Sequence, residues 1–214
     1  MTADRRDQIL RAAGRAVLAE GFGRTSARDI ARAIGVSPGL LHHYFPSMDT
    51  IRAAAIELFA EEDRAQLIAA LGEVGSDPLA RLDRLLRFAA PDLTDPSCRL
   101  WIDAWTEAFH NEAVRAGMQR LWEEWHADTT ELIQACVDAG VADCADPDAS
   151  ALRVLALLDG LSVQAHLFGT VSADQALAAA RRTAELELGL EIGRLAALHD
   201  AGIDAPRVVA VGAS

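Results

Sequence analysis

The sequence predicts an all-α protein, and three observations support this. Apolar residues recur at three- and four-residue spacing along most of the chain, which is the period of an amphipathic helix. A capping residue stands directly before a proline at several junctions, and proline fits the first turn of a helix. These junctions are Ser37-Pro38, Asp77-Pro78, Asp95-Pro96 and Asp146-Pro147. No stretch alternates apolar and polar residues as a half-buried strand would.

The first predicted helix covers residues 4–20. Its apolar stripe runs from Ile9 to Val17, and its arginines lie outside the stripe. Gly21-Phe22-Gly23 ends the helix.

Residues 25–45 are predicted to form two short helices joined by a tight turn. Thr25 or Ser26 can cap the first helix, and Gly35 follows its last apolar position. Ser37-Pro38 then begins the second helix, whose apolar side includes Leu41. This pattern is typical of a helix-turn-helix, whose second helix can enter a DNA major groove.

The remaining helices are predicted from periodicity and caps. Their ranges are about 48–72, 78–90, 96–109, 112–139, 147–168 and 173–197, which gives about nine helices in all. The helix from residue 48 connects an N-terminal domain, residues 1–50 with the helix-turn-helix at about 27–46, to a helical body, residues 51–198. The tail, 199–214, carries no clear signal.

The predicted helix at 147–168 is apolar nearly all round, so it must be covered on more than one side. One side can face its own core and the other a second subunit. The alanine-rich helix at 173–197 permits close backbone approach. We therefore expect a homodimer formed through these two helices. The alternative is a monomer in which both helices belong to the core.

The charge distribution is uneven. The net charge is -12, yet residues 1–52 hold eight arginines against five acidic residues. A basic N-terminal part on an acidic body would present one end to nucleic acid. No uninterrupted apolar run reaches the roughly 18 residues of a membrane span, and no secretory signal is visible. Cys98, Cys136 and Cys144 lack CxxC spacing, so we expect reduced thiols in a cytoplasmic protein.

The helix-turn-helix residues carry a family resemblance. The matching positions are Thr25, Arg28-Asp29-Ile30-Ala31, Gly35-Val36-Ser37, Gly39, Leu41 and Tyr44-Phe45. They resemble the DNA-binding domain of the tetracycline-repressor (TetR) family over about residues 5 to 58. Residues 100–169 resemble the C-terminal domain of the betaine-pathway (BetI-type) subgroup, which includes a choline-responsive regulator. The resemblance implies a dimeric transcriptional regulator, a repressor released from a near-palindromic operator by a small-molecule effector, with no cofactor.

The DNA-contacting residues expected from this resemblance and from the helix faces lie at the start of the first short helix and along the second. They are Thr25, Ser26, Arg28, Ser37, Pro38, Gly39, Leu40, His42, His43 and Tyr44. Two positions depart from the family: His42 stands where tyrosine is usual, and Met48 replaces a phosphate-contacting lysine. Adjacent histidines point about 100° apart on a helix and have no third ligand in reach, so no metal site is expected.

Aromatic residues of the body suggest an effector pocket. The candidates are Trp101, Trp105, Phe109, Trp122, Trp125, His126, His166 and Phe168, with Trp105 and Trp122 favoured. Tryptophan faces attract ammonium groups, and Asp103, Glu107, Glu123 or Glu124 could add negative charge. The alternative is that these aromatic residues form a plain core stripe.

Two other classes of function are alternatives to a regulator. An enzyme is disfavoured because the chain lacks a GxSxG, HExxH or glycine-rich phosphate motif and a Cys/His cluster. A helical interaction protein that has lost DNA binding stays open, because the lysine is missing at Met48.

Overall fold

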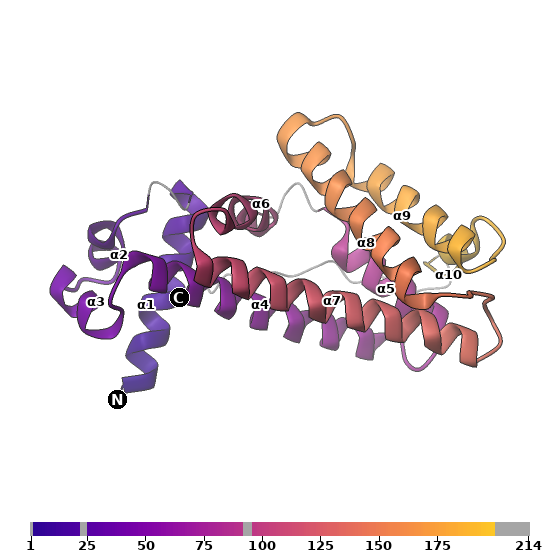
Figure 1. Cartoon of the computed structure of the whole chain (residues 1–214), viewed down its shortest axis with the longest axis horizontal. Helices are drawn as coiled ribbons and strands as arrows, with labels where there is room; N and C mark the ends of the chain where they lie inside the picture. The colour runs from indigo at the N-terminus through magenta and orange to yellow at the C-terminus, as the bar shows by residue number, and fades with distance from the viewer. Residues whose placement is uncertain (1, 22–24, 92–95, 200–214) are drawn as a thin grey trace. The chain divides into compact units, whose positions relative to one another are not determined.

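The structure is a computed structural model that describes residues 2–21, 25–91 and 96–199. Within these ranges it is helical and contains no strand (Figure 1). The helices are α1 (Thr2–Glu20), α2 (Ala27–Ala33), α3 (Pro38–Tyr44), α4 (Met48–Glu73), α5 (Pro78–Ala89), α6 (Pro96–Ala108), α7 (Glu112–Asp138), α8 (Pro147–Val163), the π-helical turn η1 (Gln164–Phe168), α9 (Ala173–Glu187) and α10 (Arg194–His199). The all-α prediction is confirmed. The predicted tail lies outside the described residues, apart from His199.

Local caps begin the helices where the sequence predicts. The Ser26 side chain accepts a hydrogen bond from the Asp29 amide, and the Asp29 carboxylate accepts one in return from the Ser26 amide. Asp77 and Asp146 cap α5 and α8 ahead of their prolines. Ser172 forms a second reciprocal box at the start of α9. These bonds satisfy amides that have no partner inside the helix.

The prediction of one helix over 173–197 is wrong. The helix α9 ends at Glu187, and Gly189 adopts φ +62°, a conformation that glycine reaches without steric strain. The Leu190 amide then bonds back to the Glu185 carbonyl at 2.8 Å. The buried Glu185 carboxylate accepts hydrogen bonds from the Gly193 and Leu195 amides, at 3.0 and 2.8 Å. This carboxylate therefore caps a separate helix, α10.

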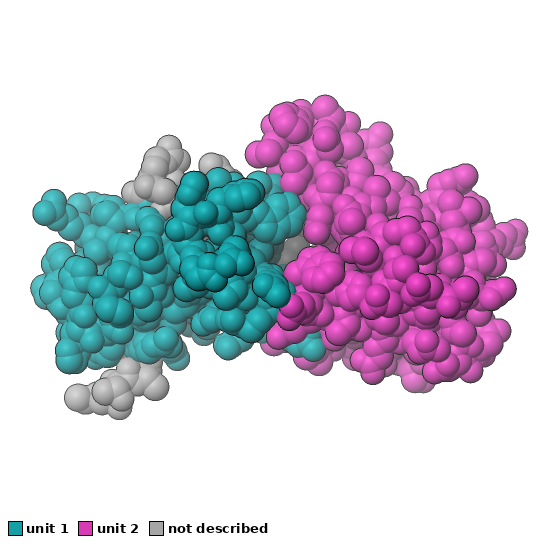
Figure 2. Space-filling view, in the orientation of Figure 1, with its two compact units in different colours: residues 1–64, 95–121, 209–214 teal, residues 65–94, 122–208 magenta. Residues whose placement is uncertain are grey.

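The chain forms two compact units (Figure 2). Unit 1 contains α1 to α3, the part of α4 up to Arg64, α6, and α7 as far as Leu121. Unit 2 contains the rest of α4 and α7 together with α5, α8, α9 and α10. These units divide the chain by packing, whereas the functional boundary at residue 50 stays a prediction.

Unit 1 has two adjoining hydrophobic clusters. The first joins α1 to α4 around Ile9, Ile30, Leu41 and Phe45. The second packs α6 and α7 against α1 and α4; its buried members are Val17, Ala53, Ile56, Leu100, Ala104 and Val114. The helices α1 to α3 therefore share a packed body with α6 and the start of α7.

Unit 2 is held by one large core and a buried ion pair. Leu82, Leu85 and Leu86 place α5 in the centre of this core. The Arg181 guanidinium donates to both carboxylate oxygens of Asp83, at 2.7 and 2.8 Å, and so joins α9 to α5. Breaking such a buried pair by removing one partner would leave an uncompensated charge.

The helix α8 leaves apolar surface uncovered in the single chain. Pro147–Phe168 is long and apolar enough to cross a membrane by length and composition, and 28% of its most apolar window is buried. A single helix of this kind is weak evidence for a membrane protein. Leu152 and Leu167 are among its exposed side chains. By contrast, the alanine stripe of α9 is buried inside the chain, at Ala176, Ala180 and Ala184.

Candidate nucleic-acid interface

The helix α3 presents a polar, exposed face next to a buried one. Leu41 is fully buried, whereas Gly39, His42 and His43 are exposed and Leu40 is partly exposed. Ser37 caps the helix by accepting from the Leu40 amide at 3.3 Å. Seven residues span about 10 Å of helix, which fits a major groove about 12 Å wide. The exposed face is therefore available to base edges.

The two histidines and the tyrosine lie at the C-terminal end of α3. The His43 ring stands edge-on to Tyr44, with centroids 5.3 Å apart. Tyr44 is half-buried and packs against the first cluster, and its phosphate contact stays a prediction. Within the described ranges, no group of three or more His, Cys, Asp or Glu side chains could hold a metal ion.

The start of α2 combines an exposed guanidinium with a capped first turn. Arg28 is exposed and lies in that turn. Hydrogen bonds from Ser26, and then the nearby Arg32, lower the pKa of Asp29, so its carboxylate stays charged at neutral pH. Arg28 therefore offers a positive charge to a phosphate at this end of α2.

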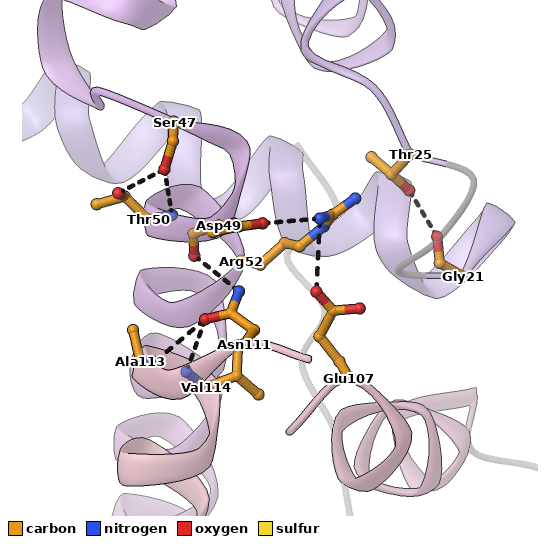
Figure 3. Close-up of polar contacts among 10 residues, drawn as sticks. All are labelled: Gly21, Thr25, Ser47, Asp49, Thr50, Arg52, Glu107, Asn111, Ala113 and Val114. Carbon is orange, nitrogen blue, oxygen red and sulfur yellow. Dashed lines mark hydrogen bonds and ion pairs between the residues drawn. The ribbon is translucent and has the colours of Figure 1, made fainter. Parts of the chain in front are cut away.

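Thr25 is engaged inside the free protein. It is 3% exposed, and both its hydroxyl and its amide donate to the Gly21 carbonyl, at 3.0 and 3.2 Å (Figure 3). A phosphate contact by Thr25 stays a prediction, and it would have to replace one of these bonds.

The corner between α6 and α7 holds the first turn of α4 (Figure 3). Arg52 contacts Asp49 at 3.0 Å and reaches the Glu107 carboxylate at 3.4 Å. The Asn111 side-chain amide lies 3.5 Å from the Asp49 carbonyl, and its oxygen accepts from the Ala113 and Val114 amides, at 3.1 and 3.2 Å. One buried asparagine therefore caps α7 and binds α4.

Sequence analysis did not identify this corner. Asparagine directly before Glu112 is a local cap signal and could have been recognised. Its bond to Asp49 could not, because the two residues are 62 positions apart.

The predicted effector residues of unit 1 lie on α6 and just after it. Trp101 is partly buried and packs against the second cluster of unit 1. Trp105 is also partly buried. Phe109 is 85% exposed. Each of these positions stays a prediction as a ligand contact.

The predicted effector residues of unit 2 include one stacked pair. Trp122 lies parallel to His126 with ring centroids 4.9 Å apart, and His126 Nε2 lies 3.1 Å from the Asp148 carbonyl of α8. Trp125 instead packs into the core of unit 2 beside Phe88, at 6.0 Å. A half-exposed Trp122 can therefore meet a ligand, whereas Trp125 serves packing.

His166 and Phe168 lie in the π-helical turn η1. The His166 Nδ1 atom is 2.9 Å from the Ser162 carbonyl, while Nε2 is buried with no hydrogen-bond partner among the described residues. A buried polar atom left unpaired is costly and is satisfied by a water or a ligand in many proteins. Phe168 is exposed.

Two titratable groups have pKa values raised by burial. Burial raises the pKa of Asp159, on α8, to about 6. Burial, with a smaller contribution from Asp77, raises the pKa of the Cys136 thiol to about 11, so this thiol stays protonated and poorly reactive. The raised pKa of Asp159 could not be predicted from the sequence, because a single acid inside an apolar helix carries no signal about its surroundings.

Comparison with known proteins supports the assignment of both parts. Residues 9–55 match the family described as bacterial regulatory proteins, tetR family. Residues 78–189 match the C-terminal domain of the BetI-type transcriptional repressors, which covers more than half of the chain.

Individual relatives agree with the family matches. The regulator PksA of Bacillus subtilis is 30% identical over 76% of this chain and 79% of its own. The regulator BetI of Pseudomonas aeruginosa is 30% identical over 81% of this chain and 87% of its own. A regulator from Saccharomonospora viridis, crystallised with choline, superposes with a TM-score of 0.76 at 27% identity, over 84% of this chain and 94% of its own. The chain therefore belongs to the TetR family of DNA-binding transcriptional regulators, and its C-terminal domain is of the BetI type.

Proposed function

We propose that this regulator is a one-component repressor in which two copies of the chain bind a near-palindromic operator through α3 and release it when a small-molecule effector binds. The exposed face of α3 carries the proposal, because Leu41 anchors the helix while Gly39, His42 and His43 stay free to meet base edges. Such a protein would act in the cytoplasm, where its DNA is.

The proposed dimer forms through α8 and α9. The uncovered apolar side chains of α8 and η1, including Leu152 and Leu167, support it. Leu186 adds an exposed apolar side chain on α9. A twofold pair would place the two α3 helices about 34–36 Å apart, one turn of DNA or somewhat more.

The proposed effector is a small organic cation. Support comes from the half-exposed Trp122 stacked on His126, from the unpaired His166 Nε2, and from a structural relative crystallised with choline. The interaction of an ammonium group with a tryptophan face contributes about 0.5–2 kcal/mol to binding. Effector binding would shift the population of positions that the two N-terminal domains adopt, with α4 as one of the helices that run through both units. A coupling of about 1–3 kcal/mol changes DNA affinity roughly 5–150-fold.

Selection of duplexes from a random pool, followed by footprinting at low salt, tests the DNA part. We expect an enriched near-palindrome and protection of two half-sites on one side of the duplex. Absence of any enriched or protected sequence would contradict the proposal.

Arg28→Ala tests whether the start of α2 approaches the DNA backbone. This change should weaken binding to selected and unrelated duplexes alike, and it should reduce the salt slope by about 0.9 for each phosphate that the protein no longer neutralises. Arg32→Ala is the matched control, because Arg32 lies on the same short helix and is already paired with Asp29. An Arg28 variant with full affinity would show that α2 does not approach the backbone.

Tryptophan emission tests the effector part. Choline, tetramethylammonium and a neutral hydrophobic ligand are titrated into the protein, and we expect the cations to change the emission. Trp122→Phe should abolish this change and Trp125→Phe should leave it in place, since Trp125 packs into the core. An emission spectrum that neither choline nor tetramethylammonium changes would contradict an effector of the size of these cations.

A further inference from the structure

Arg6, on α1, covers an aromatic ring at the C-terminal end of α3. Its guanidinium carbon lies 5.2 Å from the centroid of the Phe45 ring. Phe45 directly follows α3 and is 1% exposed. The distance lies within the range of a cation–π interaction, so the cluster of α1 to α4 holds a positive charge at this end of the recognition helix.

Among the described residues, no acidic side chain pairs with this charge. By contrast, Arg11, Arg32 and Arg52 all have acidic partners. Stacking uses the face of the guanidinium and leaves the N–H donors along its edge. Arg6 is exposed, so solvent can reach its side chain in the free protein.

The C-terminal end of α3, where Arg6 lies over Phe45, would come close to a DNA strand if α3 entered a major groove. A helix about 10 Å long is close in length to the roughly 12 Å width of a major groove, so an end of α3 in the groove would lie near a phosphate backbone at its border. The C-terminal end of a helix carries partial negative charge, which repels a phosphate. A cation at that end would offset this repulsion and favour close approach.

We propose that Arg6 is a phosphate anchor for DNA at the C-terminal end of α3, held in place by the ring of Phe45. Its planar fork can donate two parallel hydrogen bonds to one phosphate. The contact is independent of base sequence. The inference rests on the proposed entry of α3 into the major groove, and it adds a DNA contact from α1, an element that does not itself enter the groove.

The test compares three variants of the full-length protein: Arg6→Ala, Arg6→Lys and Arg15→Ala. Arg15 is an exposed arginine on the same helix, about half a turn round from Arg6, and serves as the matched control. Binding is measured by fluorescence anisotropy from 50 to about 300 mM NaCl, a range over which phosphate contacts change the affinity strongly. The probes are a duplex enriched from a random pool by the unsubstituted protein and an unrelated duplex of equal length.

Arg6→Ala should lower the slope of log K against log[NaCl] by about 0.9 per protomer on both duplexes, with roughly 5-fold weaker binding at moderate salt. Arg6→Lys should retain the slope but recover only part of the affinity, because lysine keeps the charge and loses the planar fork. Arg15→Ala should match the unsubstituted protein. Thermal unfolding of each variant shows whether the N-terminal domain is still folded.

An unchanged slope for Arg6→Ala, with tight binding by the unsubstituted protein, would overturn the anchor alone. A weakening confined to the enriched duplex would overturn it too, because that result indicates base reading. If the unsubstituted protein binds neither duplex, the proposed entry of α3 into the groove fails and the anchor fails with it.

Discussion

At the residue scale, Asp159 is a carboxylate inside the apolar helix α8, and its pKa of about 6 follows from burial. The unfolded chain would titrate near 3.9, so the folded protein binds more protons between about pH 4 and pH 6. Stability therefore falls as the pH rises through this window, and above it the buried charge costs up to about 3 kcal/mol. Asp159→Asn should raise the free energy of unfolding by about 1–3 kcal/mol at pH 8 and leave it unchanged below about pH 4.

Urea unfolding at fixed protein concentration, repeated from pH 4 to pH 8, measures this difference. Asp148→Asn is the control, because Asp148 lies in the first turn of the same helix with an exposed side chain. This control should show no gain at high pH. If Asp159→Asn is no more stable than the unsubstituted protein at pH 8, the carboxylate has a stabilising partner in the assembled protein.

At the scale of elements, Gly14 shows how α1 and α4 approach each other. A Cβ atom at this glycine would lie 2.3 Å from Phe59 Cε2 and 2.4 Å from Cζ. Helix propensity alone favours alanine over glycine by about 1 kcal/mol. We expect the opposite result: Gly14→Ala should destabilise the protein by about 1–3 kcal/mol, since the ring has to move out of a packed cluster.

Thermal and urea unfolding measure the effect of Gly14→Ala. Gly72→Ala is the matched control, because it lies in a helix, α4, with nothing within 4 Å of its added Cβ. This control should be neutral or more stable. Adding Phe59→Leu to Gly14→Ala should restore part of the stability, and a stabilised single variant would contradict the close approach.

At the scale of the whole molecule, the uncovered face of α8 leads to a prediction about assembly. Leu152→Glu would place a charge in the proposed interface between subunits, where its desolvation costs several kcal/mol. Sedimentation equilibrium should then show the mass of a single chain, 22.9 kDa, in place of twice that value. The affinity for an operator with two half-sites should fall at least about 10-fold, because two linked DNA-binding domains bind far more tightly than one.

Ile68→Glu is the control for this change. Ile68 is more exposed than Leu152, at 60% against 47%, but lies on α4, outside the proposed interface. The variant should keep the mass and DNA affinity of the unsubstituted protein. A Leu152→Glu protein that still has twice the chain mass would show that the subunits meet elsewhere.

The starts of the helices could be predicted from the sequence because each cap acts within three residues. Ser26 with Asp29, Ser37 with Leu40, and Asp146 with Ala149 are bonds between near neighbours. The helix-turn-helix face follows for the same reason, since Leu41 marks the buried side and the helical period places the histidines on the other. The family was recognisable from these short-range positions.

Tertiary structure alone decided the contacts between residues far apart in the chain. It paired Asp83 with Arg181, 98 positions away, and brought Arg6 onto Phe45. The end of α9 at Glu187 is a local feature by contrast, set by Gly189 with its positive φ and by the Glu185 carboxylate that caps α10. The sequence by itself determined helix positions and their buried faces, which depend on local hydrogen bonds and periodicity. Which helix faces pack together depends on the free energies of packing and desolvation over the whole folded chain. A short sequence pattern does not contain that information.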